Sequence, residues 1–319
     1  ERRVKISLKE GISEKLYVEA IVESESGHRA TAVIAGQHTH FVYVEKDGKV
    51  LLDNRMPQGE EAGEDECELN LRKVYDFSVE APLEEIEFIR EARRLNESAS
   101  RQALKGCYGH ELGKTLSRPL GRGIMGDTIF SHILSSTSCA CDARMAGAMI
   151  PVMSNSGSGN QGMTASLPVV EYAKEYNKTE EELIRAVILS DLITIHQKSK
   201  IGRLSAFCGA ISAGCGAAAG IAYLLGGDYD TIAHTLVNSL AIVSGIVCDG
   251  AKASCAGKIA AAVNAGILGY NMYLNGSQFW AGDGIVSKGV ENTIRNVGRL
   301  GRDGMRETDR EILKIMTEE

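Results

Sequence analysis

Aromatic residues and proline are scarce in this sequence of 319 residues. Phe, Trp and Tyr make up 5% of it, with one Trp and five Pro. Gly and Ala are abundant in the second half instead, so the core there must be built from small side chains, which predicts closely packed helices. Basic clusters are also missing. The net charge is −7, and no group of Lys and Arg extends beyond a few residues, which argues against nucleic acid as a partner.

Long apolar runs are missing as well. Residues 207–227 carry no charge, but they are rich in Gly, Ala and Ser. This composition favours a buried helix over a membrane span, so we expect no membrane association. No secretory signal precedes the first strand-like residues, and we expect a cytoplasmic protein.

Cysteine spacing excludes a disulfide scaffold. The spacings are irregular and the chain is long, so we expect free thiols or metal ligands in a reducing compartment. The eight cysteines are Cys67, Cys107, Cys139, Cys141, Cys208, Cys215, Cys248 and Cys255. No Cys-x-x-Cys pair and no His-x-x-x-His helix occurs, which counts against a zinc hydrolase. The glycine-rich stretch "SNSGSGNQG" does not end in the Gly-Lys-Ser/Thr of a phosphate-binding Walker loop, so it does not match one.

The pattern of apolar residues predicts an α+β fold. Residues 3–53 alternate apolar and polar side chains, which predicts a small antiparallel sheet of about four strands with a tight turn at "KDGK". Residues 55–66 are acidic and contain Gly, as in a linker. A mostly buried, all-helical part follows, with a capping box at Thr179 and Glu182. We expect an antiparallel β subdomain at 1–60, a helical catalytic-type domain at 68–319, and their boundary near residues 55–82.

The stretch "SNSGSGNQG" has no charge and lies between two apolar segments. Its glycines let backbone N–H groups converge, and the sequence after it is helical, so the stretch opens onto a helix N-terminus suited to a carboxylate or phosphate. The alternative is a packing turn between two core helices. The candidate binding residues are Ser154, Asn155, Ser156, Gly157, Ser158, Gly159, Asn160, Gln161 and Thr164.

Cysteines and basic residues in apolar surroundings are further candidates. Cys208, Cys248 and Cys255 lie at the ends of predicted buried helices, where thiolates can bind iron or zinc, although buried Cys is also common as a small apolar residue. Lys198 and Lys200 lie between two apolar helices, and so could bind an anion or act as a base, or simply reach to solvent.

Four longer motifs resemble a known family. They are "DARMAGAMIPVMSNSGSGNQGMTASLPVV", "KSKIGRLSAFCGAISAGCGAAAGIAYLLGG", "VCDGAKASCAGKIAAAVNAG" and "RNVGRLGRDGMRETDREIL". Together they resemble the L-cysteine desulfidase family, which is related to the α chain of bacterial iron–sulfur L-serine dehydratases. The likeness runs from about residue 1 to 316.

The resemblance implies a lyase with a [4Fe–4S] cluster. Such an enzyme eliminates sulfide or water from L-cysteine or L-serine and yields pyruvate and ammonia. Cys208 and Cys248 match two cluster ligands, and Cys255 is a weaker candidate. The family's remaining ligand lies in an N-terminal "PALGCTEP"-like motif that this sequence lacks. We therefore expect an N-terminally shortened chain whose sheet is the remnant of a larger domain, and whose activity is in doubt.

A mechanism follows from the resemblance as a hypothesis. The loop would hold the α-carboxylate of a small amino-acid substrate, and Lys198 or Lys200 would remove the α-proton, with Asp142 as a further candidate base. The alternative is a cluster-free relative that binds amino acids or regulates without catalysis. A homodimer is a further expectation.

Overall fold

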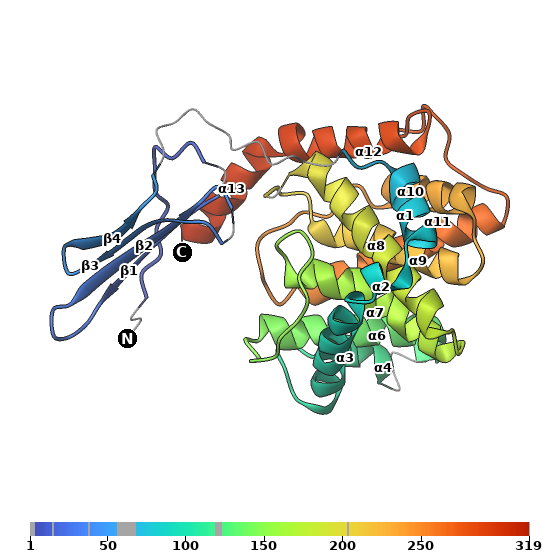
Figure 1. The fold of residues 1–319 in the computed structure, drawn as a ribbon, viewed down its shortest axis with the longest axis horizontal. Coiled ribbons are helices and arrows are strands. Elements are labelled where there is room, and N and C mark those ends of the chain that lie inside the picture. The colour runs from blue at the N-terminus through green and yellow to red at the C-terminus, as the bar shows by residue number, and fades with distance from the viewer. Residues whose placement is uncertain are drawn as a thin grey trace. The chain divides into compact units, whose positions relative to one another are not determined.

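The computed structural model describes residues 4–14, 16–37, 39–55, 68–118, 123–202 and 204–318 (Figure 1). The chain divides into two compact units, residues 1–68 with 311–319, and residues 69–310. The last nine residues group with the sheet in this division, and the expected domain ranges of 1–60 and 68–319 stay predictions. Most of the expected linker at 55–66 lies outside the described residues.

The first unit holds the predicted antiparallel sheet. Four strands follow one another in the order β1-β2-β3-β4, each antiparallel to the next. They are β1 (Tyr17–Glu23), β2 (Arg29–Ala35), β3 (Phe41–Lys46) and β4 (Lys49–Asp53). Asp47 and Gly48 have φ angles of 50° and 80°, so both central residues of the β3–β4 turn are left-handed, which suits the twist of a two-residue hairpin. The small N-terminal sheet is confirmed.

The second unit is helical, as predicted. Its helices are α1 (Leu71–Glu80), α2 (Leu83–Ile86), α3 (Ile89–Lys105), α4 (Leu112–Ser117), α6 (Ile129–Met145), α7 (Gly159–Glu175), α8 (Glu180–Ile201), α9 (Gly209–Leu224), α10 (Tyr229–Ile242), α11 (Cys255–Leu274) and α12 (Val290–Arg299). A π-helical turn, Leu300–Gly304, follows α12, and α13 (Arg306–Thr317) ends the described chain. No residue of α13 is buried.

Local signals set several helix ends. Thr179 and Glu182 form the predicted capping box at the start of α8, with bonds of 3.2 Å and 2.8 Å between side chain and backbone. Two helices follow Pro82, the short α2 and the longer α3. The uncharged stretch from Phe207 begins its helix only at Gly209, because Phe207 pairs instead with Val247 in a short antiparallel bridge.

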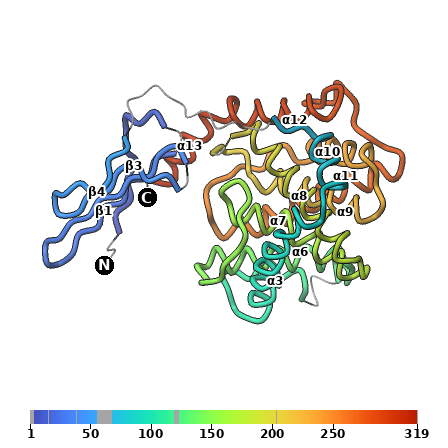
Figure 2. Tube along the Cα trace, in the orientation of Figure 1, coloured from blue at the N-terminus to red at the C-terminus, as the bar shows by residue number. Residues whose placement is uncertain are grey.

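Helix α9 lies at the centre of the core. It packs against α7, α8, α10 and α11 (Figure 2). A methyl group added at Gly214 would lie 2.7 Å from the Ala262 carbonyl oxygen of α11, and one at Gly216 would lie 2.5 Å from the Ser190 carbonyl oxygen of α8. These backbones approach so closely that a side chain would not fit. The small-residue composition therefore produces the tight packing that the sequence predicts.

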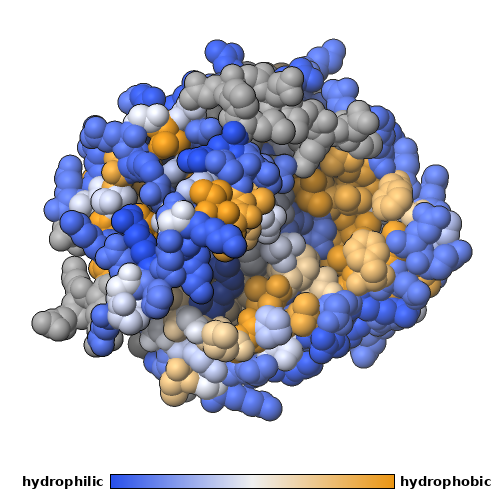
Figure 3. All heavy atoms as spheres, turned by 60° about the vertical axis from the view of Figure 1, so that its left-hand side comes forward, coloured by the Kyte–Doolittle hydropathy of each residue, from blue (hydrophilic) through white to orange (hydrophobic). Residues whose placement is uncertain are grey.

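The surface mixes polar and apolar residues. Figure 3 shows hydrophilic residues over much of the visible face, interrupted by groups of hydrophobic ones. None of the described helices has the length and apolar character needed to span a bilayer.

Candidate functional site

The loop before α7 is a closed turn. Asn155 and Ser158 exchange two backbone hydrogen bonds of 3.1 Å and 3.0 Å. Ser156 and Gly157 between them have φ angles of 50° and 80°. The Ser158 hydroxyl accepts from the backbone N–H of Gln161 at 3.4 Å and so caps α7. The second half of the predicted binding loop is therefore the first turn of a helix.

Most polar side chains of this loop are committed to local bonds. The Asn155 amide donates to Asp191 Oδ1 at 2.9 Å and to the Asp191 carbonyl at 3.1 Å. Ser156 donates to Asn155 Oδ1 at 2.8 Å. Thr164 donates to the Asn160 carbonyl at 2.7 Å. These side chains fix the loop rather than point to a ligand.

The backbone retains donors for a ligand. Within the described part of the chain, no hydrogen-bond acceptor is recorded for the N–H groups of Ser156, Gly157, Gly159 and Asn160. The N–H groups of a first helical turn also carry partial positive charge. An anion such as a carboxylate would satisfy them. This agrees with the expectation that the backbone supplies the positive potential, although the binding roles of the loop residues stay predictions.

Gln161 connects the loop to the cysteines. Its side chain is 8% exposed, and its carboxamide lies where a methyl group on Gly209 would be. Gly209 is the first residue of α9, directly after Cys208. The loop and the start of α9 are therefore neighbours, although α7 and α8 separate them in the sequence.

Cys208 and Cys248 form a pair. Cys208 donates its backbone N–H to the Ile246 carbonyl at 3.1 Å, and Cys248 donates to the Ala206 carbonyl at 2.6 Å. The two side chains share a hydrogen bond, which lowers the pKa of Cys248 to about 6 and raises that of Cys208. The N–H of Gly250 and the nearby Lys258 ammonium favour the same ionisation. The ionised form of Cys248 is thereby favoured, with the Cys208 thiol as its hydrogen-bond donor.

Cys255 lies in the same neighbourhood. Its sulfur accepts from the backbone N–H of Lys252 and donates to the Gly250 carbonyl, both at 3.5 Å. Cys255 lies close enough to Cys208 and Cys141 to add to the rise in their pKa values. The main cause is the hydrogen bond with Cys248 at Cys208 and burial at Cys141. The seven cysteines in the described ranges are all free, and Cys67 lies outside these ranges.

The three candidate thiols do not form a site for a single ion. Among the described residues, no three Cys, His, Asp or Glu side chains are placed to hold one metal ion together. An iron–sulfur cluster differs from a single ion, because each cysteine binds a different iron atom and the sulfurs are farther apart. Cys208, Cys248 and Cys255 therefore stay candidate ligands of such a cluster.

The candidate bases lie in three different places. Lys198 is 6% exposed, and burial lowers its pKa, whereas the nearby Cys248 and Cys208 act in the opposite direction. Lys200 packs its Cβ against Gly298 of α12. Its positive charge favours the ionised form of the Glu291 carboxyl. Only the first of these lysines faces the thiols.

The Asp142 side chain accepts a hydrogen bond from the start of α4. Its Oδ2 accepts from the backbone N–H of Gly113 at 2.8 Å, in the first turn of α4. Burial raises its pKa. The structure thus gives this carboxyl a capping contact, and its role as a base stays a prediction.

Arg144 was not predicted as a site residue. It lies at the end of α6, and its Nη1 donates to Asn160 Oδ1 at 3.2 Å. The sequence signal was a charged residue in the apolar stretch "DARMAGAM", but the contact with α7 depends on how α6 and α7 pack.

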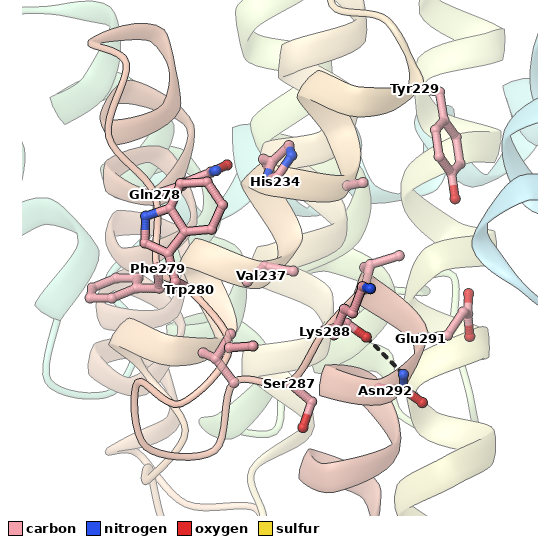
Figure 4. A pocket seen from close by; sticks show the side chains of 15 residues that line it. Tyr229, His234, Val237, Gln278, Phe279, Trp280, Ser287, Lys288, Glu291 and Asn292 are labelled. Atoms are coloured by element: carbon pink, nitrogen blue, oxygen red, sulfur yellow. Dashed lines mark hydrogen bonds between the residues drawn. The ribbon is translucent and has the colours of Figure 1, made fainter.

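A separate cavity lies elsewhere in the helical unit. It has a volume of about 460 Å³ and lies between α10, the start of α12 and the segment that joins α11 to α12 (Figure 4). Its walls carry the aromatic residues Tyr229, His234, Phe279 and Trp280. None of the residues predicted from the sequence lines it. Scattered aromatic residues gave no sequence signal for this cavity.

Fold and site together define a class of two-part α+β proteins. A small antiparallel sheet accompanies a helical unit, in which a cysteine pair, a buried lysine and the starts of two helices lie close together. Residues 14–314 match the family described as serine dehydratase alpha chain. The chain belongs to this family, and the resemblance to serine dehydratase-like proteins is confirmed.

Several relatives are similar over almost the whole chain. A UPF0597 protein of Bacteroides fragilis is 53% identical over 317 residues, which are 99% of this chain and 74% of the relative. A UPF0597 protein of Desulfitobacterium hafniense is 52% identical over 285 residues, 89% of this chain and 65% of the relative. One of Porphyromonas gingivalis is 40% identical over 320 residues, 98% and 74% of the two chains.

Proposed function

We propose that this protein is a lyase that eliminates water from L-serine or sulfide from L-cysteine. The observation that carries the proposal is the contact between Gln161 and Gly209, which joins the anion-binding loop to the Cys208–Cys248 pair. Membership of the serine dehydratase alpha chain family supports the same chemistry. Free thiols in the described chain suit a reducing cytoplasm, where we place the reaction.

The loop binds the amino acid through its backbone. The free N–H groups of Ser156, Gly157, Gly159 and Asn160 donate hydrogen bonds to the α-carboxylate. Neutralising the carboxylate makes the α-proton more acidic, because the carbanion that forms next to it is then less strongly repelled. Asn155 contributes indirectly, because its bond to Asp191 holds the turn against α8.

Lys198 is the base of the proposal. Burial lowers its pKa, so a larger fraction is neutral amine at neutral pH than for an exposed lysine. Its place beside the thiols puts it near the substrate, whereas Lys200 faces α12. The protonated lysine can afterwards return its proton to the leaving group.

Cys208, Cys248 and Cys255 would hold the cofactor. The donor set fits an iron–sulfur cluster, because the surroundings of Cys248 lower its pKa and two further thiols lie nearby. When bound, a [4Fe–4S] cluster would supply a Lewis acid for the β-hydroxyl or β-thiol. The chain's own residues position the substrate next to it.

The reaction balances without an oxidant. Removal of the α-proton and loss of the β-substituent convert L-serine into aminoacrylate and water, or L-cysteine into aminoacrylate and hydrogen sulfide. Aminoacrylate tautomerises to an imine, and one water hydrolyses the imine to pyruvate and ammonia. No redox change occurs.

The test is anaerobic. The natural full-length protein is reconstituted with iron and sulfide, and pyruvate is measured with L-serine and with L-cysteine. We expect turnover of at least one of them. A bound cluster without turnover of either would overturn the lyase proposal, and a colourless protein that binds amino acids in calorimetry would favour the non-catalytic alternative.

A further inference from the structure

Arg144 lies directly on the first turn of α7. Its Nη1 donates to Asn160 Oδ1 at 3.2 Å. A methyl group added to Gly159 would come within 2.6 Å of Arg144 Nε. The guanidinium group is therefore packed against the two residues that begin the helix, beside their free backbone N–H groups.

This cation has no counter-ion. Among the described residues, no carboxylate forms an ion pair with Arg144, although its side chain is half-buried. The nearest carboxyl in the sequence, Asp142, is bonded to Gly113 instead. Arg93, which is buried to a similar degree, pairs with both Glu97 and Glu180. Removing a guanidinium partly from water without pairing it with an anion costs free energy. We therefore expect Arg144 to bind a negatively charged ligand.

A second group on the same turn also lacks a partner. Gln161 is 8% exposed, and its Oε1 has no hydrogen-bond donor among the described residues. Buried acceptors of this kind are normally satisfied. One turn of α7 thus offers a cation and N–H donors for a carboxylate, together with an unused acceptor beside Gly209 at the start of α9.

We propose that Arg144 binds the carboxylate of a small amino acid at the start of α7. Arginine can donate two parallel hydrogen bonds to a carboxylate, whereas each backbone N–H donates one. The bond to Asn160 Oδ1 holds the guanidinium in place for this contact. The identity of the ligand rests on the proposed function, whereas the carboxylate contact itself does not.

Calorimetry with three probes tests this assignment. L-serine carries a carboxylate and an ammonium group, pyruvate carries only the carboxylate, and ethanolamine carries only the ammonium group. Binding is measured for the wild type, Arg144→Met, Arg144→Lys and the control Arg93→Met. We expect Arg144→Met to weaken L-serine and pyruvate by about 10- to 100-fold, Arg144→Lys to weaken them less, and Arg93→Met to leave them unchanged.

Methylguanidinium added to Arg144→Met should restore part of the affinity, which a merely structural role would not allow. Circular dichroism checks that the variants are folded. If Arg144→Met does not fold, the binding comparison is made with Arg144→Lys. Unchanged pyruvate and L-serine binding in the Arg144 variants, or no carboxylate binding by the wild type, would overturn the assignment. Carboxylate binding that depends on Arg144, without turnover of L-serine or L-cysteine, would uphold it and overturn only the lyase proposal.

Discussion

At the scale of single residues, the chemistry comes from groups whose surroundings change their ionisation. Lys198, Asp191 and Cys248 are ordinary residue types with pKa values moved by burial or by a neighbour. The sequence predicted Lys198 and Cys248 as candidates from their apolar surroundings. It could not separate Lys198 from Lys200, because that distinction depends on which face of α8 meets the thiols. Asp191 gave no signal, because its partner Asn155 is distant in the sequence.

Asp191 should make the stability of the protein depend on pH. Burial raises its pKa from 3.8 to about 7, and the bond from Asn155 only partly opposes this. Stability is therefore fully present below the unfolded pKa and is lost as the pH rises through the folded one, by at most about 4 kcal/mol at 1.36 kcal/mol per pKa unit. Asp191→Asn keeps an acceptor for Asn155 and removes the titration. Its free energy of unfolding in denaturant should exceed that of the wild type increasingly from pH 5 to pH 8.

A second aspartate provides the control for this pH dependence. Asp228 caps α10, and its pKa is lowered by the bonds from Thr231. Its contribution to stability is lost only as the pH falls below the ordinary range of a carboxyl group. Asp228→Asn should therefore shift stability by a constant amount between pH 5 and pH 8. A constant difference for Asp191→Asn as well would contradict the assignment of a raised pKa.

The two lysines of α8 should differ in catalysis. Under the proposed function, Lys198→Met removes the base but keeps a long side chain in the buried position, so kcat should fall about 100-fold or more. Lys200→Met removes an equal charge that faces α12, and its kcat should stay within about threefold. Pyruvate formation by the reconstituted variants gives both values. Equal losses in the two variants would show that Lys198 is not the base.

At the scale of elements, helix starts build the site and close helix packing positions them. The sequence predicted the capping box of α8 correctly, because its residues are local. It placed the start of the uncharged helix too early, because Phe207 pairs with Val247, forty residues away. That pairing leaves Cys208 at the first position before α9 and brings Cys248 beside it. Non-local pairing of this kind cannot be derived from periodicity.

The contact between α9 and α11 should not tolerate a methyl group. In Gly214→Ala the new carbon would lie 2.7 Å from the Ala262 carbonyl oxygen, so the helices must move apart. Alanine favours a helix over glycine by up to about 1 kcal/mol, but overpacking costs about 1–3 kcal/mol. We expect a net loss in the free energy of unfolding. Gly245→Ala, where nothing lies within 4 Å, should show no such loss in the same denaturant titration.

At the scale of the whole molecule, composition and motifs predicted the α+β architecture, the sheet and the family. The sequence carries no signal for the grouping of residues 311–319 with the sheet, because α13 has no buried residue that ties it to the helical core. Arg144 was missed for a related reason, since its importance lies in a contact between two helices. Sequence patterns thus report what each segment buries, whereas the site depends on where separate segments meet.

The site and the core should be separable, because the thiols lie at turns whereas the core consists of helix interiors. Cys248 is half-buried after α10, whereas Cys215 is fully buried inside α9. Under the proposed function, Cys248→Ser should lose the visible absorption of a reconstituted cluster and the turnover, yet keep its helical circular dichroism. Cys215→Ser should retain absorption and turnover, with unfolding easier by about 1–3 kcal/mol because a hydroxyl replaces a buried thiol. Air exposure or an iron chelator should likewise remove the visible absorption and the turnover of the wild type. Loss of helical signal together with the absorption would mean instead that the cofactor holds the fold together, as it does in small metal-dependent domains.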